Sequence, residues 1–257
     1  MNSLVSTVRV SPQRQHVSLR MAILVAGLPG LCCLTGSAPV AGEPAGAFVP
    51  APASASAAER VHAEARRILE EMKDSRYSHT TRVDKDEGSY EVDCSGFVTV
   101  VLKAAAPRSL AAVPRAAGWK RPRAFEFHDA FAAAPADEMV AKGWRRIERL
   151  ADARPGDLLA WRREEIQPGE DTGHIVVVDE APVREDDGQF RVVVIDSTGK
   201  PHGDDTRQSG ATGVGRGTIW VAVDEAGRPA GFRWRARDGV LNRRPIAIGR
   251  AVEATLP

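Results

Sequence analysis

The segment from Tyr90 to Val98 contains the residue types that a thiol nucleophile needs. Its sequence is Y-E-V-D-C-S-G-F-V, with Cys94 directly after Asp93. Because Asp is a preferred helix N-cap, we expect a helix to begin at Cys94, where unpaired backbone N–H groups and the helix dipole favour a thiolate. The same N–H groups could bind an oxyanion, and Gly96 leaves space beside the sulfur. The placement favours a reactive thiol over a buried structural cysteine.

His174 is the histidine best placed to act as the base. It opens the apolar run 175–178 directly after Gly173, so it lies at the mouth of a predicted strand. A helix N-terminus could meet it there. The remaining histidines are His16 near the N-terminus, His62 on a predicted helix beside charged residues, and three in polar or loop contexts typical of the surface, His79, His128 and His202.

A hairpin could supply a carboxylate to His174. Asp186-Asp187-Gly188 is a turn signal between the strand from His174 and the strand that ends at Asp196. Folding about residue 185 sets 174 opposite 196 on one face of the sheet, where the carboxylate could orient the imidazole. A register shift of one residue would bring Ser197 or Ile195 there instead, and Asp196 could also be a turn former at a strand end.

Three segments in this order resemble the NlpC/P60 superfamily of papain-like cysteine peptidases. They are D-C-S-G-F-V at 93–98, R-P-G-D-L at 154–158 and G-H-I at 173–175. The resemblance covers about residues 57–200 and is specific as a combination. It departs from the family in the long interval between Cys94 and His174, caused by an insertion at about 107–150, and in a third polar residue that follows the histidine at a greater distance.

The resemblance implies an α+β papain-like fold, with N-terminal helices packed on an antiparallel sheet of about five to six strands. It also implies hydrolysis of amide bonds, typically in peptidoglycan peptides, by Cys94 as nucleophile, His174 as base and Asp196 as orienting residue, without a cofactor or metal. Substrate and oxyanion contacts are expected from residues around the thiol, namely Tyr77, Tyr90, Asp93 and Ser95.

Composition limits the class of protein. The chain has 257 residues, of which 43% are hydrophobic and 27% charged, as in soluble globular proteins. A formal net charge of +1 provides no overall field for nucleic acid or an anionic membrane. We expect one catalytic domain at 58–257, a monomer acting on a peptidoglycan peptide or another amide.

The N-terminal region predicts export. Basic residues precede an apolar run at 21–34, which is followed by small residues and prolines, the pattern of a secretory signal within residues 1–47. Residues 48–57 are expected to be a disordered linker. A lipoprotein is the competing interpretation, because Cys32 and Cys33 follow the apolar run, but Pro29-Gly30-Leu31 matches a lipidation box poorly. Translation could start at Met1 or Met21. Removal of this region would leave Cys94 as the one cysteine of the mature protein.

The periodicity predicts helices first and strands after. Ser56 and Glu59 have capping-box spacing ahead of an apolar helical stripe, and a second helix follows Asp93. The insertion is expected to be helical, acting either as a lid or as an extension of the core. Six strands are expected, at 157–161, 174–178, 191–196, 218–223, 231–235 and 246–252. The order indicates an α+β domain.

Three further interpretations remain. An acyltransferase would use the same residues, with an amine or alcohol replacing water. A noncatalytic wall-binding module would keep the fold, although it has no reason to retain a Cys–His–Asp set. A metal site from Cys94, His174, His202 and Asp204 or Asp205 lacks a known zinc spacing.

Overall fold

The computed structural model describes residues 55–167 and 170–253. The predicted signal at 1–47, with Cys32 and Cys33, lies outside the described residues. Of the predicted linker at 48–57, only residues 55–57 are described, and there Ser56 caps the first helix and Ala57 begins it. No helix in the described part of the chain is long and apolar enough to span a membrane.

The two helices expected before the sheet are present. α1 spans Ala57–Glu71 and begins with the predicted capping box, in which the Ser56 hydroxyl accepts from the Glu59 backbone N–H and the Glu59 carboxylate accepts from that of Ser56. α2 spans Cys94–Ala105, with Asp93 as its N-cap. Two shorter helices follow, α3 at Pro107–Ala111 and α4 at Ala124–Ala133, together with short 3-10 turns at Glu138–Val140 and Leu150–Asp152.

A large antiparallel sheet makes up the second half of the domain. Among the described residues it has eight strands, in the order β10-β9-β8-β6-β5-β11-β4, with β7 paired to β8. The bounds are β4 Gly143–Ile147, β5 Leu158–Arg162, β6 Gly173–Val178, β7 Val183–Arg184, β8 Phe190–Thr198, β9 Gly213–Val223, β10 Pro229–Arg233 and β11 Ile246–Val252. The α+β class is confirmed. The expected count of five to six strands was too low, because β4 comes from the insertion and β7 is a two-residue strand.

A small second sheet precedes the nucleophile segment. It comprises β1 at Asp74–Tyr77, β2 at Arg82–Asp84 and β3 at Ser89–Val92, none of which is among the strands expected from the sequence. β3 pairs parallel with β1 and antiparallel with β2. Since β3 runs directly into Asp93, this sheet fixes where α2 begins.

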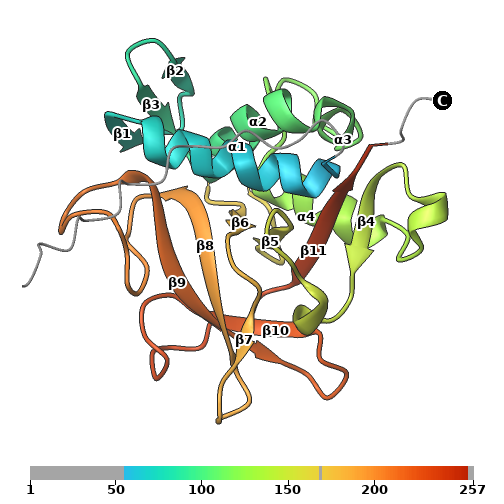
Figure 1. The fold of residues 1–257 in the computed structure, drawn as a ribbon. Coiled ribbons are helices and arrows are strands. Elements are labelled where there is room, and N and C mark those ends of the chain that lie inside the picture. The colour runs from blue at the N-terminus through green and yellow to red at the C-terminus, as the bar shows by residue number, and fades with distance from the viewer. Residues whose placement is uncertain (1–54, 168–169, 254–257) are drawn as a thin grey trace, which may run out of the picture. The chain divides into compact units, whose positions relative to one another are not determined.

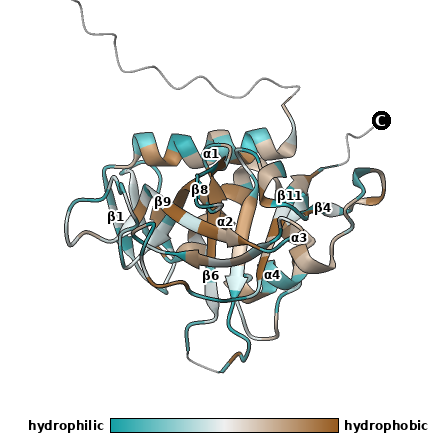
Figure 2. Cartoon of the chain, turned by 90° about the horizontal axis from the view of Figure 1, so that it is seen from below, coloured by the Kyte–Doolittle hydropathy of each residue, from teal (hydrophilic) through white to brown (hydrophobic). Residues whose placement is uncertain are grey.

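Hydrophobic residues fill both faces of the large sheet. α1, α2 and α4 lie along one side of it (Figure 1), and their apolar side chains join Ile175, Val177 and Ile195 in one core cluster. The alternate residues of the same strands, such as Val176 and Val194, belong to a second cluster with β9 and β10. Figure 2 shows the hydrophobic residues gathered along α2 and the central strands.

The insertion at 107–150 is not purely helical. Trp144 and Ile147 are buried residues of β4, which pairs antiparallel with β11 and extends the large sheet. Phe127 and Phe131 of α4 are fully buried in the core. The α4 and β4 parts of the insertion therefore extend the core. A local strand of five residues inside an Ala-rich segment was hidden by the helical composition around it.

Two glycines of the motif segments permit close approaches of the backbone. Gly156 has a φ of +88°, and a Cβ there would lie 1.9 Å from the carbonyl oxygen of Ala58. Gly173 has a φ of +130°, and its Cβ would lie 2.0 Å from the carbonyl oxygen of Trp161. The first allows α1 to rest on the turn before β5, and the second starts β6 close against β5, one residue before His174.

Candidate active site

Cys94 lies at the first position of α2, as expected, and is buried. The Asp93 carboxylate caps the helix by accepting hydrogen bonds from the Gly96 N–H at 2.7 Å and the Ser95 hydroxyl at 3.2 Å. Because the first residues of a helix have no intrahelical partners for their N–H groups, those of Cys94 and Ser95 remain to bind a developing negative charge near the sulfur.

Arg121 joins the insertion to this helix cap. Its guanidinium donates to the Asp93 carboxylate at 2.7 Å, to the Ser95 hydroxyl at 2.5 Å and to the Thr81 hydroxyl at 3.1 Å. The arginine therefore binds both polar neighbours of Cys94 and also Thr81, the residue just before β2. Nothing in the sequence linked Arg121 to Asp93, because the contact joins segments that are distant along the chain.

His174 and Asp196 meet as predicted, although the register differs. Val177 pairs with Ile195 and Val178 with Val194, which is two residues away from a hairpin that sets 174 opposite 196. A shift of two preserves the face on which each side chain lies, whereas a shift of one would have separated them. The Nε2 atom of His174 lies 2.5 Å from Oδ2 of Asp196.

The charge balance around His174 favours an imidazolium. Burial alone would lower the pKa of His174, but the charge of Cys94 and hydrogen bonds to Asp196 and Cys94 raise it to about 10. Because Nε2 is used by Asp196, Nδ1 is the ring nitrogen that remains for the thiol. An imidazolium beside the sulfur would stabilise a thiolate, which is the attacking form of cysteine.

Asp196 has more partners than the sequence predicted. His202 Nε2 lies 2.9 Å from the same Oδ2 atom that His174 contacts, and Arg207 donates to Oδ1 at 2.6 Å. The side chains of Asp196, His202 and Arg207 are all nearly or fully buried. Burial would raise the pKa of Asp196, but the charge of His202 and hydrogen bonds from both histidines hold it well below its usual range.

His202 was expected at the surface, and that expectation was wrong. The segment 199–212 folds back over β8 because Asp205 accepts from the backbone N–H groups of His202 at 2.7 Å and Arg207 at 2.8 Å. Gly203 also forms a bridge to Thr218 of β9. His128 is buried too, against the same expectation, and its Nδ1 lies 2.9 Å from Asp129. Polar neighbours in the sequence do not reveal such reversals of the chain.

Two tryptophans cover the histidines. The His174 ring centroid lies 5.2 Å from that of Trp161 and 5.1 Å from that of Trp234. Trp234 also lies against His202, with centroids 4.2 Å apart, and its indole N–H donates to the Lys200 carbonyl. Aromatic cover of this kind excludes water from the His174–Asp196 hydrogen bond and strengthens it.

The two tyrosines expected near the thiol differ. Tyr77 lines the same cleft as Asp93, and burial, followed by the negative charges of Cys94 and Asp93, raises its pKa. Burial also raises the pKa of Tyr90, but the other groups that act on it, Arg67 above all, belong to α1. The structure therefore brings Tyr77 to the site and leaves Tyr90 beside α1, because Tyr77 pairs with Val92 at the end of β3 next to the start of α2, whereas Tyr90 pairs with Ser75 two positions earlier.

A side-chain hydrogen bond connects β8, which carries Asp196, to β3, which leads into Cys94. The hydroxyl of Ser197, next to Asp196 on β8, donates to the Val92 carbonyl at 2.6 Å, two residues before Cys94. Ser75 adds a second link, since it accepts from the Val214 N–H at 2.7 Å and donates to the Tyr90 carbonyl at 3.1 Å. These bonds anchor the small sheet on β8 and β9.

A cleft of about 800 Å³ opens next to the start of α2, where its lining includes the N-cap Asp93 but not Cys94 itself. It runs along α2 from Asp93 to Lys103, and Tyr77 and Asp171 line it at the thiol end. The insertion supplies a wall at 118–123, in which Arg123 stacks 3.9 Å from the ring of half-exposed Trp119. This part of the insertion borders the cleft, while Trp144 and Trp161 are core residues.

Among the described residues, the cluster of Asp196 and its two histidines has the groups best arranged to hold a metal ion. Potential ligand atoms of His174, Asp196 and His202 lie within 4.8 Å of one another. Neither Cys94 nor Asp204 nor Asp205 belongs to this set. Both histidines direct Nε2 at one carboxylate oxygen, and the Arg207 cation occupies the other, so the donors are already used in hydrogen bonds and the charge opposes a second cation. The residues do not fit a metal centre.

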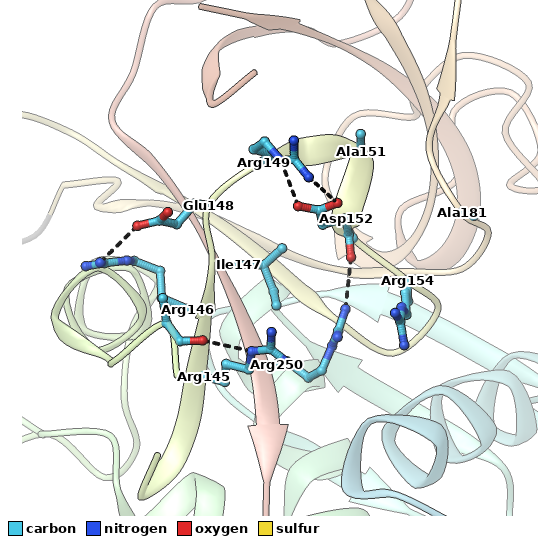
Figure 3. A pocket seen from close by; sticks show the side chains of 12 residues that line it. Arg145, Arg146, Ile147, Glu148, Arg149, Ala151, Asp152, Arg154, Ala181 and Arg250 are labelled. Atoms are coloured by element: carbon cyan, nitrogen blue, oxygen red, sulfur yellow. Dashed lines mark hydrogen bonds and ion pairs between the residues drawn. The ribbon is translucent and has the colours of Figure 1, made fainter. Parts of the chain in front are cut away.

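A second pocket, of about 610 Å³, lies at the edge formed by β4 and β11 (Figure 3). Two of its arginines are engaged within the protein, since Arg149 binds Asp152 at 2.9 Å and Arg250 binds Asp157 at 2.7 Å. Asp157 also accepts from the Arg154 N–H at 2.8 Å. The aspartate of the P-G-D-L segment therefore fastens β5 to β11 and has a structural role.

Comparison with known proteins identifies one viral relative. The chain is 29% identical over 180 residues to uncharacterized protein R653 of Acanthamoeba polyphaga mimivirus, and the alignment covers 62% of this chain and 76% of the viral protein. No protein-family model matches the chain. No solved structure matches it either.

Proposed function

We propose that this protein is an exported cysteine hydrolase of papain-like, NlpC/P60-type fold that cleaves amide bonds, with peptidoglycan peptides as the substrate class. The observation that carries the proposal is the buried Cys94 at the start of α2, which interacts with a His174 ring whose Nε2 is held by Asp196. The spacing of D-C-S-G-F, P-G-D-L and G-H-I supports it.

The groups of the site fit each step of amide hydrolysis. The Cys94 thiolate attacks the carbonyl carbon, and the resulting oxyanion lies against the free N–H groups at the start of α2 and the Tyr77 phenol. The His174 imidazolium then gives its proton to the leaving amine, which departs and leaves a thioester on Cys94. Neutral His174 takes a proton from water, the hydroxide attacks the thioester, and the acid product leaves with the thiolate and imidazolium restored.

An acyltransferase is the alternative that uses the same residues. An amine or alcohol in the cleft along α2 would replace water in the second half-reaction, and the chemistry of Cys94 would be unchanged. A noncatalytic binding module is disfavoured by the burial of His174 against Asp196, because a binding surface does not require a covered and oriented imidazole.

The experiment that tests the proposal is incubation of the protein with intact peptidoglycan and defined muropeptides, followed by mass spectrometry of the products. We expect one class of amide bond to be cut, and Cys94→Ala to lower the rate by roughly 10³-fold or more. Transfer to an added amine would appear as a product of larger mass. The proposal is wrong if Cys94→Ala, shown to be folded by circular dichroism, cleaves at the wild-type rate.

A further inference from the structure

Asp196 is shared by two histidines, and only one of them faces the thiol. His174 and His202 both direct Nε2 at Oδ2, at 2.5 Å and 2.9 Å. The two rings are 6.4 Å apart and roughly perpendicular. A carboxylate oxygen that accepts from two donors gives each of them a weaker bond than it would give one.

The side chain of His202 has no other polar function in the described structure. It is fully buried, and its Nδ1 has no hydrogen-bond partner among the described residues. Its ring packs on Trp234, which also covers His174. Among the described residues, the buried His202 ring therefore makes one polar contact, with Asp196.

We infer that His202 is a positioning residue that draws part of the Asp196 charge away from His174, so that the His174 imidazolium can release its proton to a leaving group. The inference rests on the proposed function, because it concerns the acid step of that reaction. An imidazolium that is paired too strongly with its carboxylate keeps its proton and is a poor general acid. Whether the His202 ring is neutral or charged, its N–H donor weakens the hold of Asp196 on the His174 proton.

The charged groups around His174 determine whether loss of His202 makes the His174 ring hold its proton more or less tightly. Cys94 from α2 and Asp196 from β8 carry the negative charges, and Tyr77 from β1 lies beside the thiol. His202 and Arg207, both from the segment 199–212, oppose them through Asp196. Removal of the His202 donor concentrates the Asp196 charge on His174 and stabilises its protonated form.

The test is ring ¹⁵N NMR of histidine-labelled protein, with His174 followed between about pH 8 and 12. We expect His202→Phe, which keeps the packing on Trp234 but lacks a donor, to raise the titration midpoint of His174 by about one unit. His202→Asn, whose amide can donate to Oδ2, should restore most of the wild-type midpoint. His128→Phe is the matched control, since it removes a buried histidine from α4 and should leave the midpoint unchanged.

Two results would overturn the inference, and they differ in what else they reject. An unchanged or lowered midpoint in His202→Phe, with wild-type His174 still titrating near pH 10, rejects the role of His202 alone. A wild-type His174 that titrates as an ordinary histidine, together with slow alkylation of Cys94 by iodoacetamide at neutral pH, rejects the thiolate–imidazolium pair and with it the proposed function.

Discussion

Two buried aspartates lie near opposite ends of β6, and they have similar partners. Asp196 contacts His174, His202 and Arg207, whereas Asp179, directly after β6, contacts His62 at 2.9 Å. The Asp179 carboxylate also binds two arginines, Arg66 at 3.2 Å and Arg216 at 2.6 Å. Each cluster therefore combines a histidine, an arginine and a buried acid.

The clusters differ in what surrounds the histidine. His62 is on α1 with 27% of its side chain exposed, and the Asp179 cluster joins α1 to β9 without a nucleophile. His174 is covered by two tryptophans and interacts with Cys94. A His–Asp pair is thus insufficient for chemistry, and the helix-borne thiol and the exclusion of water distinguish the proposed active site from a structural ion pair.

The largest difference between the two clusters should appear when the histidine of each is replaced by alanine. His174→Ala should lower the rate of Cys94 alkylation by iodoacetamide at pH 7 about tenfold or more, because the thiol loses the group that takes its proton. Turnover of a cleaved muropeptide should fall by roughly 10³-fold. His62→Ala should change neither rate. Equal loss in the two variants would mean that the clusters do not differ in function.

The second comparison replaces the two carboxylates. After Cys94, Asp196 is the second group that raises the pKa of His174, so in Asp196→Asn the alkaline limb of the alkylation profile should move from near pH 10 to lower pH, with turnover reduced roughly 10²-fold. Asp179→Asn should leave that profile unchanged and lower the free energy of unfolding by about 2 kcal/mol. An alkaline limb that stays near pH 10 in Asp196→Asn would contradict the assignment of Asp196.

The pH dependence of stability gives the Asp179 variant a second readout. Burial would raise the pKa of Asp179, but His62 and Arg216 lower it overall. A depressed pKa means that the group stabilises the fold above the pKa of an unfolded aspartate, and that this contribution disappears as the pH falls through the folded value. Thermal unfolding should therefore separate wild type from Asp179→Asn at neutral pH and bring them together in acid.

The sequence predicted the parts of the site that depend on local structure. Asp93 as N-cap, Cys94 at the first helical position and the alternation of β6 follow from short-range rules, and the face shared by His174 and Asp196 survived a register error of two residues. His202 could not be placed in this way, because its burial depends on a loop that returns to β8 through Asp205.

Long-range contacts also explain the errors at Tyr90 and in the insertion. Tyr90 and Tyr77 have similar local settings, and only the packing of β3 under α1 separates them. β4 is a strand because β11, about a hundred residues later, offers it an edge. Patterns of a few residues carry no information about such partners, so the positions of Cys94 and His174 were predictable and the residues that enclose them were not.

The smallest expected effect separates two arginines that each bind a buried aspartate. Arg121 binds Asp93 and Ser95 beside Cys94, whereas Arg216 binds Asp179. Arg121→Gln should loosen the start of α2 and slow Cys94 alkylation about threefold, the effect of roughly 0.7 kcal/mol on a helix cap. Arg216→Gln should lower thermal stability by a similar free energy and leave alkylation unchanged.

Arg123→Gln is the control for the cleft itself. Arg123 belongs to the same wall as Arg121, but it stacks on Trp119 and donates to the Glu170 carbonyl at 3.2 Å instead of binding the helix cap. Because iodoacetamide is small and neutral, loss of a wall cation alone should not slow its reaction with the thiol. If Arg123→Gln slows alkylation as much as Arg121→Gln does, the effect comes from the shape or charge of the cleft, and the insertion acts on substrate access instead of on the nucleophile helix.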